Sequence, residues 1–155
     1  MLSNAHLFLS LFIAFILGAS IGVERIYSGK STGIRVFGFV SLGAALFVIV
    51  SQVVAAQYAG SVGFNFDPLR VTAQIVTGIG FLGAGMIIFK NNHIENLNTA
   101  AGIWLAAGIG AATGFGLYWI AVFTTILVIF AYSFLFRIEK RLFLSKEEKE
   151  NNPEK

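Results

Sequence analysis

The feature that most constrains this chain is a set of long apolar runs that contain no charged side chain. Residues 7–23, 36–56 and 71–89 are three such runs, and residues 100–136 form a longer fourth. A bilayer core of ~30 Å needs ~20 apolar residues in a helix. As one helix the fourth run would be about 55 Å long at ~1.5 Å per residue, which is close to two crossings. Residues 113–116 (TGFG) supply a break, so the sequence predicts an all-α, polytopic membrane bundle of about five transmembrane helices.

The composition supports a membrane environment and limits the chemistry. Hydrophobic residues make up 56% of the chain and charged residues 12%, whereas about a quarter of the residues in a soluble domain are charged. The absence of cysteine excludes disulfides and thiolate chemistry. His6 and His93 lie far apart, and neither a Ser-His-Asp nor an H-E-x-x-H pattern occurs. We therefore expect no enzymatic activity, no cofactor, no metal site and no nucleic-acid partner.

The basic residues predict the orientation, because lysine and arginine favour the cytoplasmic side of a membrane. With five spans, the first linker, the third linker and the C-terminal segment share one side, and they hold every lysine and arginine except Arg70. This places the N-terminus outside and the C-terminus in the cytoplasm. A bundle of four spans would place the C-terminal segment outside and remove this uneven distribution of basic residues. No basic residue precedes the first run, which is the wrong polarity for a cleaved signal peptide.

The composition changes after Phe136, which divides the chain into a transmembrane domain (1–137) and a charged cytoplasmic tail (138–155). We expect the start of the tail to continue the last helix, and residues from about 147 onward to lack fixed structure. Arg137, Lys140 and Arg141 either contact anionic lipid headgroups or serve only to set the topology.

Residues 78–85 (GIGFLGAG) contain the G-x-G-x-x-G spacing of a dinucleotide-binding turn in Gly78, Gly80 and Gly83. Such a turn requires a preceding strand and an acidic residue about twenty positions later in a soluble unit. Here the glycines lie inside an apolar span, so the nucleotide interpretation fails. Two interpretations stay open: the glycines allow close helix packing, or they kink or unwind the span and line a substrate site.

Small residues at four-residue spacing also occur in other spans. They favour close approach between helices, because lipid tails give no hydrophobic driving force for helix association. We therefore expect the first, third and fourth spans in the centre of the bundle, with the second and fifth as lipid-facing covers. The glycines expected to serve helix packing are Gly18, Gly22, Gly78, Gly80, Gly83, Gly85, Gly102 and Gly110.

Polar residues at the span ends are the candidate functional residues. Asp67 fits an N-cap with Pro68 in the first helical position, and Arg70, Gln74 and Thr77 form a polar stripe along the third span. The stripe either meets headgroups at Arg70 or faces the bundle interior and contacts a ligand or partner. Asn98 and Thr99 resemble a cap for the fourth span.

On the same side as Asn98, Glu24 either pairs locally with Lys30 or Arg35, or forms a cytoplasmic vestibule with Arg35 and Asn98. Glu24 and Asp67 fall on opposite sides of the membrane, so they cannot form one carboxylate pair.

Four stretches carry a family resemblance: LGASIGVER (17–25), GIRVFGFVSLGAALF (33–47), DPLRVTAQIVTGIGFLGAGMI (67–87) and LNTAAGIW (97–104). In this order they resemble the MgtC/SapB family of bacterial inner-membrane proteins, and the block R-x-x-A-Q-I-V-x-G-I-G-F-L-G-A-G is the most specific. The matched polar residues are Glu24, Arg25, Arg35, Asp67, Arg70, Gln74, Asn98 and Thr99.

The resemblance implies a non-enzymatic, regulatory protein of the inner (plasma) membrane. Family members are linked to growth at low magnesium and to virulence, and the best-known member is described as restraining the F-type ATP synthase. The implied partners are membrane lipids and either another membrane protein or further copies of the chain. The alternative is a transporter or channel for a cation or another small solute, and a third interpretation is a lipid-interacting protein.

The chain departs from the family pattern at three places. Well-known members continue into an ACT-like C-terminal domain, whereas about nineteen residues follow the last span here, so we expect a short form. Glu95 stands where the family has arginine, so an anion or lipid contact by that residue is not expected to carry over. Gly102 replaces a family threonine and loses its hydroxyl.

Overall fold

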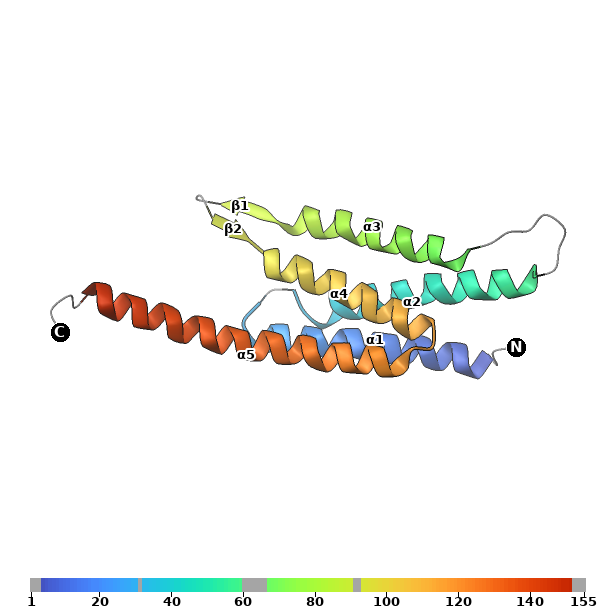
Figure 1. Cartoon of the computed structure of the whole chain (residues 1–155), viewed down its shortest axis with the longest axis horizontal. Coiled ribbons are helices and arrows are strands. Elements are labelled where there is room, and N and C mark those ends of the chain that lie inside the picture. The colour runs from blue at the N-terminus through green and yellow to red at the C-terminus, as the bar shows by residue number, and fades with distance from the viewer. Residues whose placement is uncertain (1–3, 31, 60–66, 91–92, 152–155) are drawn as a thin grey trace.

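The computed structural model describes residues 4–30, 32–59, 67–90 and 93–151, and Figure 1 shows it as an elongated helical bundle. The described elements, in chain order, are α1 (Asn4–Tyr27), α2 (Ile34–Gln57), α3 (Pro68–Met86), β1 (Ile88–Lys90), β2 (His93–Glu95), α4 (Leu97–Gly114) and α5 (Tyr118–Asn151). The strands form a small antiparallel hairpin in which Phe89 lies opposite Ile94. The predicted all-α membrane bundle is confirmed.

The break in the fourth apolar run lies where the sequence places it. Helix α4 ends at Gly114 and α5 begins at Tyr118. Gly116 lies between them with φ +77°, a left-handed conformation that glycine adopts without steric cost. Among the described helices, α1, α2, α3 and α5 are long and apolar enough to cross a membrane. Helix α4 is not among these four, because it is built largely of glycine, alanine and threonine.

The core forms where α1, α2 and α4 meet. Phe37 of α2 is fully buried against Ile21 of α1 and Ile103 of α4. A Cβ on Gly18 would lie 2.5 Å from the Phe37 carbonyl oxygen, and a Cβ on Gly110 would collide with the Ser41 carbonyl oxygen. The expectation that α1 and α4 are central holds, but the expectation that α2 only covers the bundle is wrong. Small residues of α1 and α4 are the reason, since they accept the backbone of α2 directly.

Helix α3 lies at the edge of the bundle, not in its centre as we expected. Only 6% of its membrane-spanning part is buried inside the chain, against 33% for α1 and for α2. A Cβ on Gly78, Gly80 or Gly85 would meet no atom of the chain within 4 Å. The helix is also uninterrupted from Pro68 to Met86, so the unwound segment that one of the two interpretations of its glycines required does not occur.

The helices alternate in direction, so their connections gather at two ends of the bundle (Figure 1). One end holds the N-terminus, the end of α2, the start of α3 and the α4–α5 turn. The other end holds the α1–α2 connection, the hairpin and the C-terminal part of α5. Helix α5 continues to Asn151, beyond residue 147, where we expected fixed structure to stop.

Candidate functional site

Helix α3 begins as its sequence predicts. Asp67 is the N-cap, and its Oδ1 accepts a hydrogen bond of 2.9 Å from the Leu69 N–H, with Pro68 at the first helical position. The cap satisfies one of the N–H groups that a helix start leaves free. The cap therefore fixes where the helix begins.

One face of α3 is turned away from the other helices. At 100° per residue, six residues fall on it, and all are exposed: Arg70, Ala73, Gln74, Thr77, Phe81 and Ala84. We call these residues the outer face of α3. The Thr77 hydroxyl donates 3.0 Å to the Ala73 carbonyl oxygen within the helix. In the isolated chain the polar stripe therefore does not face the bundle interior. The interpretation in which the stripe contacts a ligand or partner from inside the bundle required that position.

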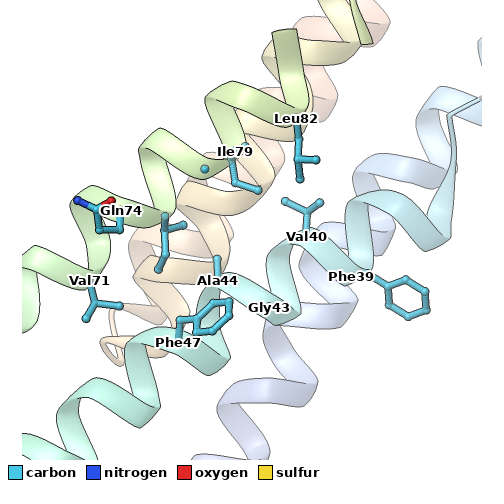
Figure 2. A pocket seen from close by; sticks show the side chains of 11 residues that line it. Phe39, Val40, Gly43, Ala44, Phe47, Val71, Gln74, Ile79 and Leu82 are labelled. Atoms are coloured by element: carbon cyan, nitrogen blue, oxygen red, sulfur yellow. The ribbon is translucent and has the colours of Figure 1, made fainter. Parts of the chain in front are cut away.

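A groove of about 470 Å³ separates α2 from α3 beside this face. Figure 2 shows Val40, Ala44 and Phe47 of α2 on one wall and Ile79 and Leu82 of α3 on the other. Among the residues that line the groove, Gln74 carries the one polar side chain. The groove is thus apolar, with an amide at its edge.

At the opposite end of the bundle, the structure buries a charged side chain that the sequence only placed at a span end. Arg25 is 5% exposed. Its Nη2 donates 3.3 Å to Thr99 Oγ1, and its guanidinium carbon lies 4.4 Å from the centre of the Tyr132 ring. The Tyr132 hydroxyl donates 2.8 Å to the Asn98 carbonyl oxygen. Arg25, Thr99 and Asn98 are thereby brought together, and Tyr132 of α5 is a member of the cluster that the sequence reasoning missed.

The proposed capping role of Asn98 is wrong. The N-cap of α4 is Asn96, which has φ 67° and makes no side-chain capping hydrogen bond. Its Nδ2 donates instead to the Met86 carbonyl oxygen at 3.3 Å, which ties the end of α3 to the start of α4. Asn98 lies within the first turn of α4.

Glu24 does not join the residues with which we expected it to act. Its Oε1 accepts 2.6 Å from the Ser28 hydroxyl, and its Oε2 is buried without a partner. Within the described residues Glu24 forms no ion pair with Lys30 or Arg35. Glu24, Arg35 and Asn98 border three different hollows, so neither the local pair nor the common vestibule forms.

In the described ranges, no three side chains of His, Cys, Asp or Glu lie close enough together to hold a metal ion. His93 lies exposed on β2. The fold and these sites define a polytopic helical membrane protein in which α3 presents an exposed face with polar side chains and Arg25 is buried against Thr99 and Tyr132.

The sequence places the chain in a known family. Residues 11–141 match the MgtC family, so the chain belongs to the MgtC family. This confirms the resemblance found in its motifs.

Two relatives illustrate the similarity. The Escherichia coli K12 protein named "Putative magnesium transporter YhiD" is 36% identical over 139 residues, which is 90% of this chain and 65% of the relative. "Protein MgtC" of Salmonella typhimurium LT2 is 38% identical over 134 residues, which is 86% of this chain and 54% of the relative. The chain therefore spans between about half and two thirds of the length of these proteins. No solved structure matches it.

Proposed function

We propose that the chain is a regulatory membrane protein that acts, in adaptation to low magnesium, by contact with another membrane protein. Family membership and the names of the relatives support a membrane protein with a magnesium-related role. The outer face of α3 supports the contact. It is the observation that carries the proposal.

The outer face combines polar groups with small residues in a way that lipid alone does not favour. Gln74 has no acceptor or donor on a neighbouring helix in the described chain, and Arg70 is exposed beside it. An amide facing lipid has no hydrogen-bond partner, whereas bonds across helices contribute about 1–2 kcal/mol in model peptides. Gly80 lies at the border of the outer face, four residues before Ala84, and the space beside it is open. Together with Ala73 and Ala84, it lets a second helix approach the backbone closely. The matching partner is a transmembrane helix with small residues and a polar side chain near Gln74.

Replacing Gly80 by leucine tests this function. The change fills space that is empty in the isolated chain, and it replaces glycine by a better helix former, worth about 1 kcal/mol. We expect the variant to fold at normal levels yet fail to restore growth at low magnesium in a strain that lacks the protein. Phe123→Leu on the exposed side of α5 is the matched control and is expected to restore growth. Growth of the Gly80→Leu strain equal to wild type would contradict the proposal.

The second candidate is transport of a cation or small solute, which the name of the Escherichia coli relative favours. Gln74 at the edge of the α2–α3 groove is the polar group available for it. The test measures magnesium flux into proteoliposomes that contain either the wild-type protein or the Arg70→Ala variant. Flux with the wild-type protein but not with the variant would support transport. Equal flux in the two samples, or none, would reject it.

The proposed orientation keeps the N-terminus outside and the C-terminus in the cytoplasm. The end of the bundle that holds the α1–α2 connection and the hairpin contains Arg25, Lys30, Arg35 and Lys90, whereas the opposite end contains Arg70. This separation supports the orientation, because basic residues are retained on the cytoplasmic side.

A further inference from the structure

The start of α4 leaves its backbone donors free. The first hydrogen bond of this helix runs from the Ala100 N–H to the Asn96 carbonyl oxygen. The N–H groups of Leu97, Asn98 and Thr99 have no acceptor within the described chain. The N-cap side chain that would normally accept one of them bonds to Met86 instead. A helix start with free N–H groups attracts negative charge, because the helix dipole is positive there.

Arg25 lines a hollow at the start of α4, and its surroundings also indicate an anionic ligand. The guanidinium is almost entirely buried, forms no ion pair among the described residues, and leaves Nε without a hydrogen-bond partner. A buried charge is costly unless an opposite charge or several hydrogen bonds compensate it. The Thr99 hydroxyl and the Tyr132 ring supply part of this compensation. An anion would supply the rest.

The hollow has the size and position for a phosphate group. Its volume is about 520 Å³, and its lining includes Arg25, Lys30 and the first residues of α4. Glu95 lines it too and opposes an anion, but two cationic side chains and the helix start outweigh one carboxylate. The site lies at the end of the bundle that holds the α1–α2 connection and the hairpin, where we expect a membrane-spanning bundle to meet lipid phosphates and water. A tetrahedral phosphate has enough oxygens to accept from the backbone N–H groups and a guanidinium together.

We propose that Arg25 and the start of α4 form a binding site for a phosphate group, either that of an anionic lipid or inorganic phosphate. The site is separate from the outer face of α3, so it can be tested without reference to the proposed partner. Its occupation links α1 to α4 through one anion.

The test compares the full chain with Arg25→Gln and with Arg35→Gln, a matched control at the same end that borders a different hollow. Native mass spectrometry of protein released from phosphatidylcholine vesicles with phosphatidylglycerol measures the retained lipid. Thermal unfolding in phosphatidylcholine alone, with phosphate or chloride at equal ionic strength, measures the effect of inorganic phosphate. We expect Arg25→Gln to weaken binding about tenfold or more, and Arg35→Gln to leave it unchanged.

The two readouts distinguish the source of the phosphate. Selective retention of phosphatidylglycerol that depends on Arg25 assigns the site to lipid, and stabilisation by phosphate that depends on Arg25 assigns it to the free ion. If Arg25→Gln does not fold, Glu95→Gln takes its place and is expected to strengthen binding several-fold, since it removes the opposing charge. Equal binding in all variants, or equal losses in Arg25→Gln and Arg35→Gln, would overturn the proposal.

Discussion

At the residue scale, the glycines separate into two groups that the sequence does not distinguish. Gly18 and Gly22 lie against α2, and Gly102 lies against Tyr132, so a side chain at any of these positions would collide with the bundle. Gly83 approaches Ala100 at ordinary van der Waals distance, and the remaining glycines of α3 face open space. The four-residue spacing of glycines and other small residues shows that one side of a helix carries only small side chains. It does not show whether the chain itself supplies the helix that packs there, because that depends on tertiary arrangement.

Gly110 and Gly108 provide a matched test on one helix. A Cβ at Gly110 would collide with the Ser41 backbone, whereas a Cβ at Gly108 would meet nothing within 4 Å. We expect Gly110→Ala to destabilise the chain by about 1–3 kcal/mol through overpacking. Gly108→Ala is expected to be neutral or stabilising by up to about 1 kcal/mol, because alanine is the better helix former. Unfolding of both variants in detergent measures the difference, and equal stabilities would contradict the packing described here.

The arginine cluster is also a residue-scale feature that the sequence revealed only in part. Arg25 and Thr99 were candidates because they are polar and end or begin a span. Their contact and the burial of Arg25 depend on how α1, α4 and α5 meet, which no local pattern encodes. Tyr132 lies in an apolar span and resembles an ordinary lipid-facing aromatic in sequence. Tyr132 is half-buried, and its phenol bonds across helices to the Asn98 carbonyl oxygen.

At the element scale, the boundaries that depend on turn and cap chemistry were predictable. Asp67-Pro68 placed the start of α3, and residues 113–116 placed the break between α4 and α5. The start of α4 was assigned wrongly, because the short hairpin before it uses Asn96, not Asn98, as the N-cap. Two three-residue strands carry too little pattern to be recognised in sequence.

The Asp67 cap can be tested by comparing two substitutions. Asp67→Ala removes the oxygen that accepts from Leu69, and Asp67→Asn keeps one. We expect alanine to cost about 0.5–2 kcal/mol of stability and asparagine to cost little, since both Asp and Asn are good caps. Hydrogen exchange at the start of α3 is expected to rise only in the alanine variant. A similar rise in the asparagine variant would show that the charge, not the cap, holds this helix start.

At the scale of the whole molecule, the apolar runs predict how many helices form. They do not predict which helices lie at the centre of the bundle and which lie at its edge. Helices α1 and α2 have the same mean hydropathy of 2.2 and α5 has 2.0, yet 33% of α1 and of α2 is buried and only 17% of α5, so hydropathy does not rank the helices by burial. The central position of α2 depends on small residues presented by its neighbours α1 and α4, and α3 is left at the edge. Within the described chain, α1, α2 and α4 thus form the well-packed group, and α3 is the least buried of the four candidate spans, with 6% of its span buried against 17% for α5.

The orientation is a property of the whole molecule, and the absence of cysteine makes it easy to measure. Single cysteines at Asn4 and at Ser145 provide one reporter near each end of the chain. In whole cells, a membrane-impermeant maleimide is expected to label the Asn4→Cys variant and to spare Ser145→Cys until the cells are opened. The reverse pattern would invert the proposed topology, and labelling of both would exclude an odd number of crossings.

The contact made by the outer face of α3 is the central claim, and photo-crosslinking tests it most directly. A photoreactive phenylalanine analogue replaces Phe81, which is 78% exposed on this face, or Phe123, which is 67% exposed on α5. Both side chains are largely exposed in the isolated chain. In native membranes, we predict an adduct with one defined membrane protein from position 81 and only lipid adducts from position 123. Lipid adducts alone at both positions, or an adduct with a second copy of this chain from position 81, would contradict the account.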